Sequence, residues 1–165
     1  MGESRTAVNI VAESVRFVSG AALGLFAGAM LTEAYILVPY WRSLPPAEFF
    51  TWYAANDRRL FGYFAPLTAV TALLAIAAAI ASMWERHPRR WLTVLAAALS
   101  VAAVSTFFVY FREVNAAFAA GSLGADEVAA ELTRWASWHR WRTGMSMVAL
   151  AAGLLSLWPT GRKAW

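Results

Sequence analysis

The sequence predicts an all-α protein, an integral membrane four-helix bundle that forms one domain over residues 1–165. Three observations carry this prediction. Apolar residues make up 60% of the chain and charged residues only 15%, whereas an average soluble domain is about 25% charged. Four apolar runs are long enough to cross a bilayer, because about 20 helical residues span its hydrocarbon core. The nine tryptophans all fall at or beyond the ends of these runs, where amphipathic rings meet the lipid headgroups.

The predicted spans cover residues 17–38, 60–84, 91–111 and 143–161. The first span carries a single charge, Glu33, and the second carries none. None of the runs alternates between apolar and polar residues, which favours helices over strands. The first run is too long for the core of a signal peptide, so we expect it to remain in the protein.

The charge and cysteine counts exclude several function classes. The formal charge of +4 comes from basic residues between the apolar runs, where they set topology or contact anionic lipid, so we expect no nucleic-acid partner. The chain has no cysteine, which excludes disulfides, thiolate metal sites and a cysteine nucleophile. Basic residues near the span ends favour both termini, together with the Glu85–Arg90 turn, on the cytoplasmic side of a bacterial inner membrane.

A stripe of small residues marks one face of the first span. Gly20, Gly24 and Gly28 repeat at every fourth position, a spacing that lets another helix approach closely. Packing inside the same bundle is the favoured interpretation, and a homo-oligomer formed through this stripe is the alternative. Glu33 is five residues from Gly28, about 140° around the helix, so it should lie on a different face.

The two long loops follow one plan, which suggests two duplicated helical hairpins. A shift of 83 positions aligns Glu48, Trp52, Asn56 and Arg59 with Glu131, Trp135, His139 and Arg142. In each loop, the tryptophan, the Asn or His, and the arginine share one helical face. We expect a short interfacial helix in each long loop, leading directly into the next span.

Polar residues cluster at one side of the predicted membrane, and Glu33 is the most informative of them. It lies within a span, about 9 Å along the helix axis from Pro39. Ionisable groups inside a membrane are costly and are functional candidates by default. We therefore expect Glu33 to face the bundle interior and to contact His139 or an arginine. The alternative is that these polar groups pair with each other and with lipid.

The spacing of candidate ligands gives little support to a metal site. Glu33, Glu113 and His139 could converge, but no helix carries the Glu-x-x-His pair of a di-iron bundle. The chain also lacks a glycine-rich phosphate loop, a nucleophile elbow and a zincin motif. The sequence therefore predicts neither a metal nor another cofactor.

Five short segments carry a family resemblance that covers almost the whole chain, from about Val18 to Trp158. They are Pro39 at the end of the first span, Arg59-Leu60-Phe61, Pro66-Leu67, Asn115, and Trp135-x3-His139-x2-Arg142. Together they resemble the anthrone oxygenase-like family of small four-helix membrane proteins, most of whose members have no known function. The resemblance implies oxidation of a lipid-soluble polycyclic aromatic polyketide by O₂, without a cofactor.

The resemblance also implies roles for particular residues. Glu33 or His139 would abstract a proton from the substrate, acting as the catalytic base. The resulting anion would then pass electrons to O₂. Substrate-binding residues would include arginines that hold an oxyanion, aromatic rings that stack on the substrate, and two amides: Arg59, Arg142, Trp52, Trp135, Trp138, Asn56 and Asn115.

Two other functions remain open at this stage. One is a non-catalytic accessory or assembly subunit that binds a larger complex through its glycine stripe. The other is a haem or metal protein that uses His139 as a ligand. Colour in the purified protein would identify the second, and a copurifying hydrophobic ligand would favour the oxygenase over the accessory subunit.

Overall fold

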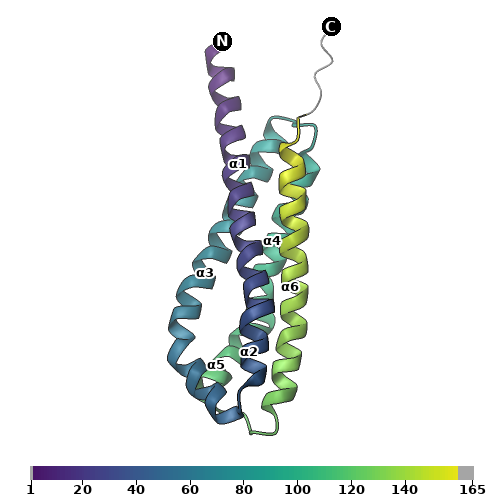
Figure 1. The fold of residues 1–165 in the computed structure, drawn as a ribbon. Coiled ribbons are helices and arrows are strands. Elements are labelled where there is room, and N and C mark those ends of the chain that lie inside the picture. Colours follow the sequence, from purple (N-terminus) through teal and green to yellow (C-terminus); the bar gives the residue numbers. More distant parts are fainter. Residues whose placement is uncertain (1, 160–165) are drawn as a thin grey trace.

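The computed structural model describes residues 2–159, and nearly all of them are helical (Figure 1). The elements are α1 (Gly2–Thr32), the π-helical segment η1 (Glu33–Leu37), α2 (Val38–Ser43), α3 (Pro46–Trp84), α4 (Arg90–Thr106), the π-helical segment η2 (Phe107–Phe111), α5 (Arg112–Ala120) and α6 (Val128–Leu157). The elements α1, η1 and α2 follow one another without a break, as do α4, η2 and α5. The described residues thus form four long helical units, which confirms the predicted all-α four-helix bundle.

The four units pack as a square with antiparallel neighbours. Helix α1 packs against α3 and α6, and α4 packs against the same two helices. At one end, Arg16 forms an ion pair of 2.8 Å with Glu85, and Arg89 donates a hydrogen bond of 2.6 Å to the carbonyl of Leu155. We call this the terminal end, because the N-terminal end of α1 and the C-terminal end of α6 both lie there (Figure 1). The opposite end, which holds α2 and α5, is the loop end.

Large apolar side chains cover the outside of the bundle, whereas small side chains fill much of its interior. Leu73, Ile80 and Val101 are exposed, while Ala75 and Ala97 are buried between helices. An exposed apolar surface of this extent is unfavourable in water but not in lipid. Small interior residues allow the close helix packing that is typical of membrane bundles.

Three helical segments are long and apolar enough to cross a membrane: Ile10–Ser43, Pro46–Trp84 and Arg90–Ala120. They contain the predicted spans 17–38, 60–84 and 91–111. Helix α6 is long enough but less apolar, because Arg134, His139, Arg140 and Arg142 lie in its first half. The fourth span, 143–161, stays a prediction, and its last two residues lie outside the described part of the chain.

The helices predicted in the two long loops are present, and each continues without a break into the next long helix. The loop segment after Pro45 is the beginning of α3, and the segment that starts at Val128 is the beginning of α6. Extending an existing helix adds one hydrogen bond per residue without the cost of a second nucleus, which favours one continuous helix. The chain turns instead at residues 44–45 and 121–127, where Gly121 caps α5 with a φ of 60°.

A π-helical segment interrupts the helix at the loop end in each half of the chain. Each segment follows a threonine, Thr32 or Thr106, whose hydroxyl bonds back to a carbonyl of the preceding turn. Each ends with a hydrogen bond between residues five apart. In η1 the Val38 N–H donates to the Glu33 carbonyl, and in η2 the Arg112 N–H donates to the Phe107 carbonyl. The two halves therefore share an order of elements. The duplication itself stays a prediction, because η1 and η2 begin 74 positions apart rather than 83.

The glycine stripe of α1 faces α6 over part of its length. A Cβ atom added at Gly20 would lie 3.4 Å from Cδ1 of Leu157, and one added at Gly24 would lie 3.9 Å from Cδ1 of Leu150. Gly28 is exposed, with open space around it. Two of the three glycines thus serve packing within the bundle, as favoured above, and a homo-oligomer through this stripe stays a prediction.

Candidate functional site

A cavity of about 650 Å³ lies between α3 and the unit formed by α4, η2 and α5. This volume is within the usual range of small-molecule sites. Most of its wall is apolar and comes from α3, α4 and η2: Leu60, Phe61, Phe64, Ala65, Ala69, Ala103, Val104, Phe107 and Phe108. Polar side chains converge toward the loop end of the cavity: Glu33, Tyr53, Asp57, Arg112, Asn115 and Arg142.

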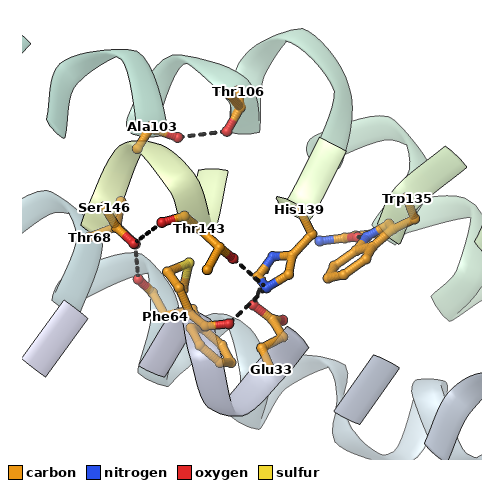
Figure 2. A network of polar contacts seen from close by, with 11 residues as sticks. Glu33, Phe64, Thr68, Ala103, Thr106, Trp135, His139, Thr143 and Ser146 are labelled. Atoms are coloured by element: carbon orange, nitrogen blue, oxygen red, sulfur yellow. Dashed lines mark hydrogen bonds and ion pairs between the residues drawn. The ribbon is translucent and has the colours of Figure 1, made fainter. Parts of the chain in front are cut away.

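Glu33 and His139 form a buried pair beside this cavity. Glu33 is the first residue of η1 and is 5% exposed, while His139 on α6 is 1% exposed. The Oε2 atom of Glu33 lies 3.5 Å from Nδ1 of His139. Figure 2 shows the carboxylate pointing toward the imidazole ring, with Trp135 beside that ring. The contact confirms that Glu33 faces the bundle interior and His139.

The surroundings of His139 determine where its protons lie. Its Nε2 atom is 3.0 Å from the carbonyl oxygen of Met30, which can only accept a hydrogen bond, so Nε2 carries a proton. The hydroxyl of Thr143 lies 3.3 Å from the same nitrogen. Nδ1 and the Glu33 oxygen have no other hydrogen-bond partner among the described residues. One further proton between these two atoms would satisfy both, and the pair is then neutral overall.

Trp135 holds the imidazole ring in place. The two rings stack, with centroids 5.0 Å apart and an angle of 20° between their planes. The Trp135 Nε1–H in turn donates a hydrogen bond of 2.9 Å to Oδ1 of Asn115 on α5. Asn115 thus fixes the indole, and the indole limits rotation of His139. Outer hydrogen bonds orient functional imidazoles in a similar way in other proteins.

Arg142 places a positive charge inside the cavity wall without a close counter-ion. It lies on α6, one turn after His139, and is 7% exposed. Among the described residues, no carboxylate lies within 4.0 Å of its guanidinium, and its Nε has no hydrogen-bond partner. The guanidinium carbon lies 5.0 Å from the centre of the Phe111 ring. A buried guanidinium of this kind is suited to bind an anionic group of a ligand.

Four of the residues predicted from the sequence line the cavity, and a fifth lies directly behind it. Glu33, Asn115, Trp135 and Arg142 belong to the lining, and His139 contacts Glu33 from behind. They come from η1, α5 and α6, so segments far apart in the chain meet at one site. Five of the nine predicted site residues therefore meet at one place in the folded protein.

Three predicted binding residues on α3 lie outside the cavity. Arg59 is exposed. Asn56 donates a hydrogen bond of 2.8 Å to the carbonyl of Trp52, within its own helix. The Trp52 ring packs against Tyr40 and Trp41, at centroid distances of 5.7 and 5.8 Å. The structure does not bring these three side chains to the site.

The predicted stacking residue Trp138 also lies apart from the cavity lining. Its indole stacks on the ring of Tyr110, with centroids 5.0 Å apart and planes 9° from parallel. The Tyr110 hydroxyl donates a hydrogen bond of 2.6 Å to Oε1 of Glu131. Trp138 therefore belongs to a contact between η2 and α6.

Sequence reasoning did not assign a role to four further polar residues of the cavity: Tyr53, Asp57, Thr68 and Arg112. On α3, the lining residues Tyr53, Asp57, Leu60 and Phe64 recur at intervals of three or four, which places them on one helical face. This periodic face was the available signal. It is shifted by one residue from the stripe of Trp52, Asn56 and Arg59 that the repeat suggested.

The surroundings of His139 do not favour a metal or haem ligand. Within residues 2–159, no group of three or more His, Asp or Glu side chains is placed to hold a metal ion. Both ring nitrogens of His139 face other groups, and the indole of Trp135 lies against the ring. The donor set thus does not fit axial ligation of haem by this residue.

Comparison with known proteins identifies the family. The family model described as anthrone oxygenase matches residues 49–152, well over half of the chain. The match includes the α3 face of the cavity, together with Asn115, Trp135, His139 and Arg142, whereas Glu33 lies before it. No curated protein and no solved structure matched the chain. From the extent of the family match, the chain belongs to the anthrone oxygenase family.

Proposed function

We propose that this protein is a membrane-embedded oxygenase that uses O₂ to oxidise a lipid-soluble polycyclic aromatic compound of the anthrone type. The observation that carries the proposal is the buried Glu33–His139 pair at the wall of a largely apolar cavity. Family membership supports the reaction class. We place the protein in a bacterial inner membrane with both termini in the cytoplasm, on the basis of the basic residues near its span ends.

The first step in this proposal is proton abstraction. An anthrone has a methylene carbon opposite the carbonyl of its central ring, and loss of a methylene proton gives an anion delocalised onto the carbonyl oxygen. The Glu33–His139 pair accepts that proton, with Glu33 as the residue that reaches the cavity. A positioned general base typically contributes about 10² to 10⁴ in rate.

The second step is reaction of the anion with O₂. The anion passes one electron to O₂, and the resulting radical and superoxide combine to form a C–O bond. The peroxide takes up one proton. Loss of the remaining proton from the same carbon, with cleavage of the O–O bond, then gives a second carbonyl and water. One anthrone and one O₂ therefore yield one anthraquinone and one water, without another electron donor.

Arg142 acts on the negative charge that develops in the first step. Its buried guanidinium lines the cavity near the base and has no close carboxylate partner among the described residues. A donor oriented in advance toward developing charge, in a site that excludes water, stabilises a transition state strongly. Trp135 and Asn115 are positioning residues in this scheme, because they act through the orientation of His139.

The test is O₂ consumption by the purified protein in phospholipid vesicles, with anthrone as substrate and formation of anthraquinone followed in parallel. The wild type is expected to consume one O₂ for each anthraquinone formed. Glu33→Gln, which keeps the shape but removes the base, should lower kcat about 10²- to 10⁴-fold. Glu48→Gln is the matched control, because Glu48 is exposed at the start of α3. Unchanged turnover in Glu33→Gln would exclude Glu33 as the base.

A further inference from the structure

We propose that the ligand enters this cavity sideways from the bilayer, through a lateral opening between α3 and the unit formed by α4, η2 and α5. The inference rests on the proposed function for the class of ligand and adds its route. The rim of the opening consists of the cavity-lining residues that are exposed on the outer surface: Phe61, Ala69, Phe108, Arg112 and Ala116. Four of these five side chains are apolar, as expected for a rim that faces lipid.

The depth of the rim follows from helix geometry. Exposed Trp84 and Trp91 mark one membrane surface at the terminal end. A hydrocarbon core of about 30 Å corresponds to about 20 helical residues. Counting 20 residues from these tryptophans along α3 and α4 places the other surface near Phe64 and Phe111. Ala69 and Phe108 of the rim therefore lie at hydrocarbon depth, and Phe61 lies about one turn past Phe64, at the level of the headgroups.

The polar part of the opening lies on the other side of that boundary. Arg112 follows Phe111 directly, and Asp57 lies about two turns beyond Phe64 along α3. Both line the cavity, and both fall at headgroup depth. Both charged groups of the cavity lining on this side of the bundle thus lie toward the headgroups, which matches an aromatic ligand whose polar edge points the same way.

The loop end of the bundle offers no comparable route from water. Trp41, Phe49, Phe118 and Trp135 are each at most 2% exposed and belong to one packed cluster at that end. The rings of Trp41 and Trp135 lie 5.3 Å apart, and those of Phe49 and Phe118 lie 5.0 Å apart, both edge to face. In contrast, Phe61 and Phe108 at the rim are 57% and 66% exposed. The lateral side is therefore the open one.

The rim aromatics also suit the class of ligand. Phe61 packs against Phe107, with centroids 6.0 Å apart, and both rings line the cavity. Both are presented by elements at the edge of the opening, α3 and η2. Aromatic rings placed in this way can contact a flat polycyclic ligand in turn as it moves from lipid to Glu33. A substrate made water-soluble by a sugar or sulfate group is not expected to use this route.

The experiment uses single-cysteine variants. Because the chain has no cysteine of its own, the label attaches only at the introduced position. Phe61→Cys and Phe108→Cys carry a bimane label at the rim. Tyr63→Cys and Val109→Cys are matched controls, because these residues are 58% and 70% exposed but do not line the cavity. The proteins are placed in phosphatidylcholine vesicles with doxyl-labelled phosphatidylcholine as quencher, and 9,10-anthraquinone is added as the probe.

The expected result is that doxyl lipid quenches the label at all four positions, whereas anthraquinone changes the emission only at the two rim positions. A pyrene maleimide attached at either rim position should slow anthraquinone binding at least about tenfold, and the same group at a control position should not. Rim labels that doxyl lipid does not quench would overturn the proposal. So would an equal response to anthraquinone at rim and control positions.

These measurements need no turnover, so they separate this inference from the proposed function. Binding of anthraquinone through the rim without any O₂ consumption would contradict the oxygenase and support the lateral opening. Normal O₂ consumption with a pyrene group at the rim would contradict the lateral opening alone.

Discussion

Replacing Arg142 with methionine is expected to weaken ligand binding without a large loss of stability. The guanidinium is 7% exposed and has no carboxylate within 4.0 Å among the described residues. A buried charge in this position is held at a cost in stability. Stability is sacrificed in this way at many functional sites, where replacing the functional residue stabilises the fold.

The size of the effect can be worked out from these surroundings. Replacing buried ionic groups with apolar side chains of similar volume is often neutral, or stabilises by about 1–4 kcal/mol. Loss of the contact between the guanidinium and Phe111, at 5.0 Å, removes about 0.5–2 kcal/mol of stabilisation. The net expectation therefore runs from a loss of about 2 kcal/mol to a gain of about 3.5 kcal/mol. Since a hydrogen bond to a charged group contributes about 1.5–3 kcal/mol, binding of an anionic ligand should fall about 10- to 150-fold.

The assay combines thermal unfolding in detergent, at one fixed scan rate, with binding of a hydroxyanthraquinone at a pH where it is ionised. Arg59→Met is the control, since Arg59 is exposed and outside the cavity lining, and it should alter neither quantity. A loss of more than about 2 kcal/mol in Arg142→Met, larger than the whole contact with Phe111 can provide, would refute the reasoning. In that case the guanidinium has a structural partner and is not reserved for a ligand.

Three further predictions concern packing and topology. Asn115→Ala leaves the Trp135 Nε1–H without its acceptor and should lower the free energy of unfolding by about 1–3 kcal/mol. In a Trp135→Phe background, which has no indole N–H, thermal unfolding should show that Asn115→Ala costs much less. Gly153→Leu should lower the unfolding temperature, because even a Cβ atom there lies 2.8 Å from Leu23, whereas Gly28→Leu should not, since nothing lies within 4 Å of the added Cβ. Tags at the two chain ends should be accessible from the same side of the membrane in intact cells, and opposite accessibility would mean that a span is miscounted.

The fold was predictable from the sequence because it depends on properties of whole segments of about 20 residues. Apolar run lengths and tryptophan positions do not depend on which helix packs against which. The cost of an isolated carboxyl group in a membrane was also enough to predict that Glu33 faces inward, toward His139 or an arginine, and the structure shows the contact with His139. The π-helical segments at Glu33 and Phe107 were not predictable, because they follow from tertiary packing and have no clear sequence signature.

Four of the seven predicted binding residues lie outside the cavity. Three of these four, Trp52, Asn56 and Arg59, were misplaced because a sequence period does not specify how a helix is rotated. The internal repeat suggested that Trp52, Asn56 and Arg59 occupy the same place as Trp135, His139 and Arg142. In the structure the cavity face of α3 lies one residue further along, at Tyr53 and at its helical neighbours. One residue is a rotation of about 100°, which is enough to turn a side chain from the cavity to the surface. Only packing against the neighbouring helices determines that rotation.

The central claim is that the Glu33–His139 pair removes a proton from the substrate before O₂ reacts. Mixing the protein with anthrone under strict exclusion of O₂ tests it most directly, because the anthrone anion absorbs at longer wavelength than the neutral ketone. The wild type is expected to accumulate about one equivalent of bound anion, which decays to anthraquinone when O₂ is admitted, and Glu33→Gln is expected to form none. A wild type that forms no anion without O₂, yet turns over when O₂ is present, would contradict the account.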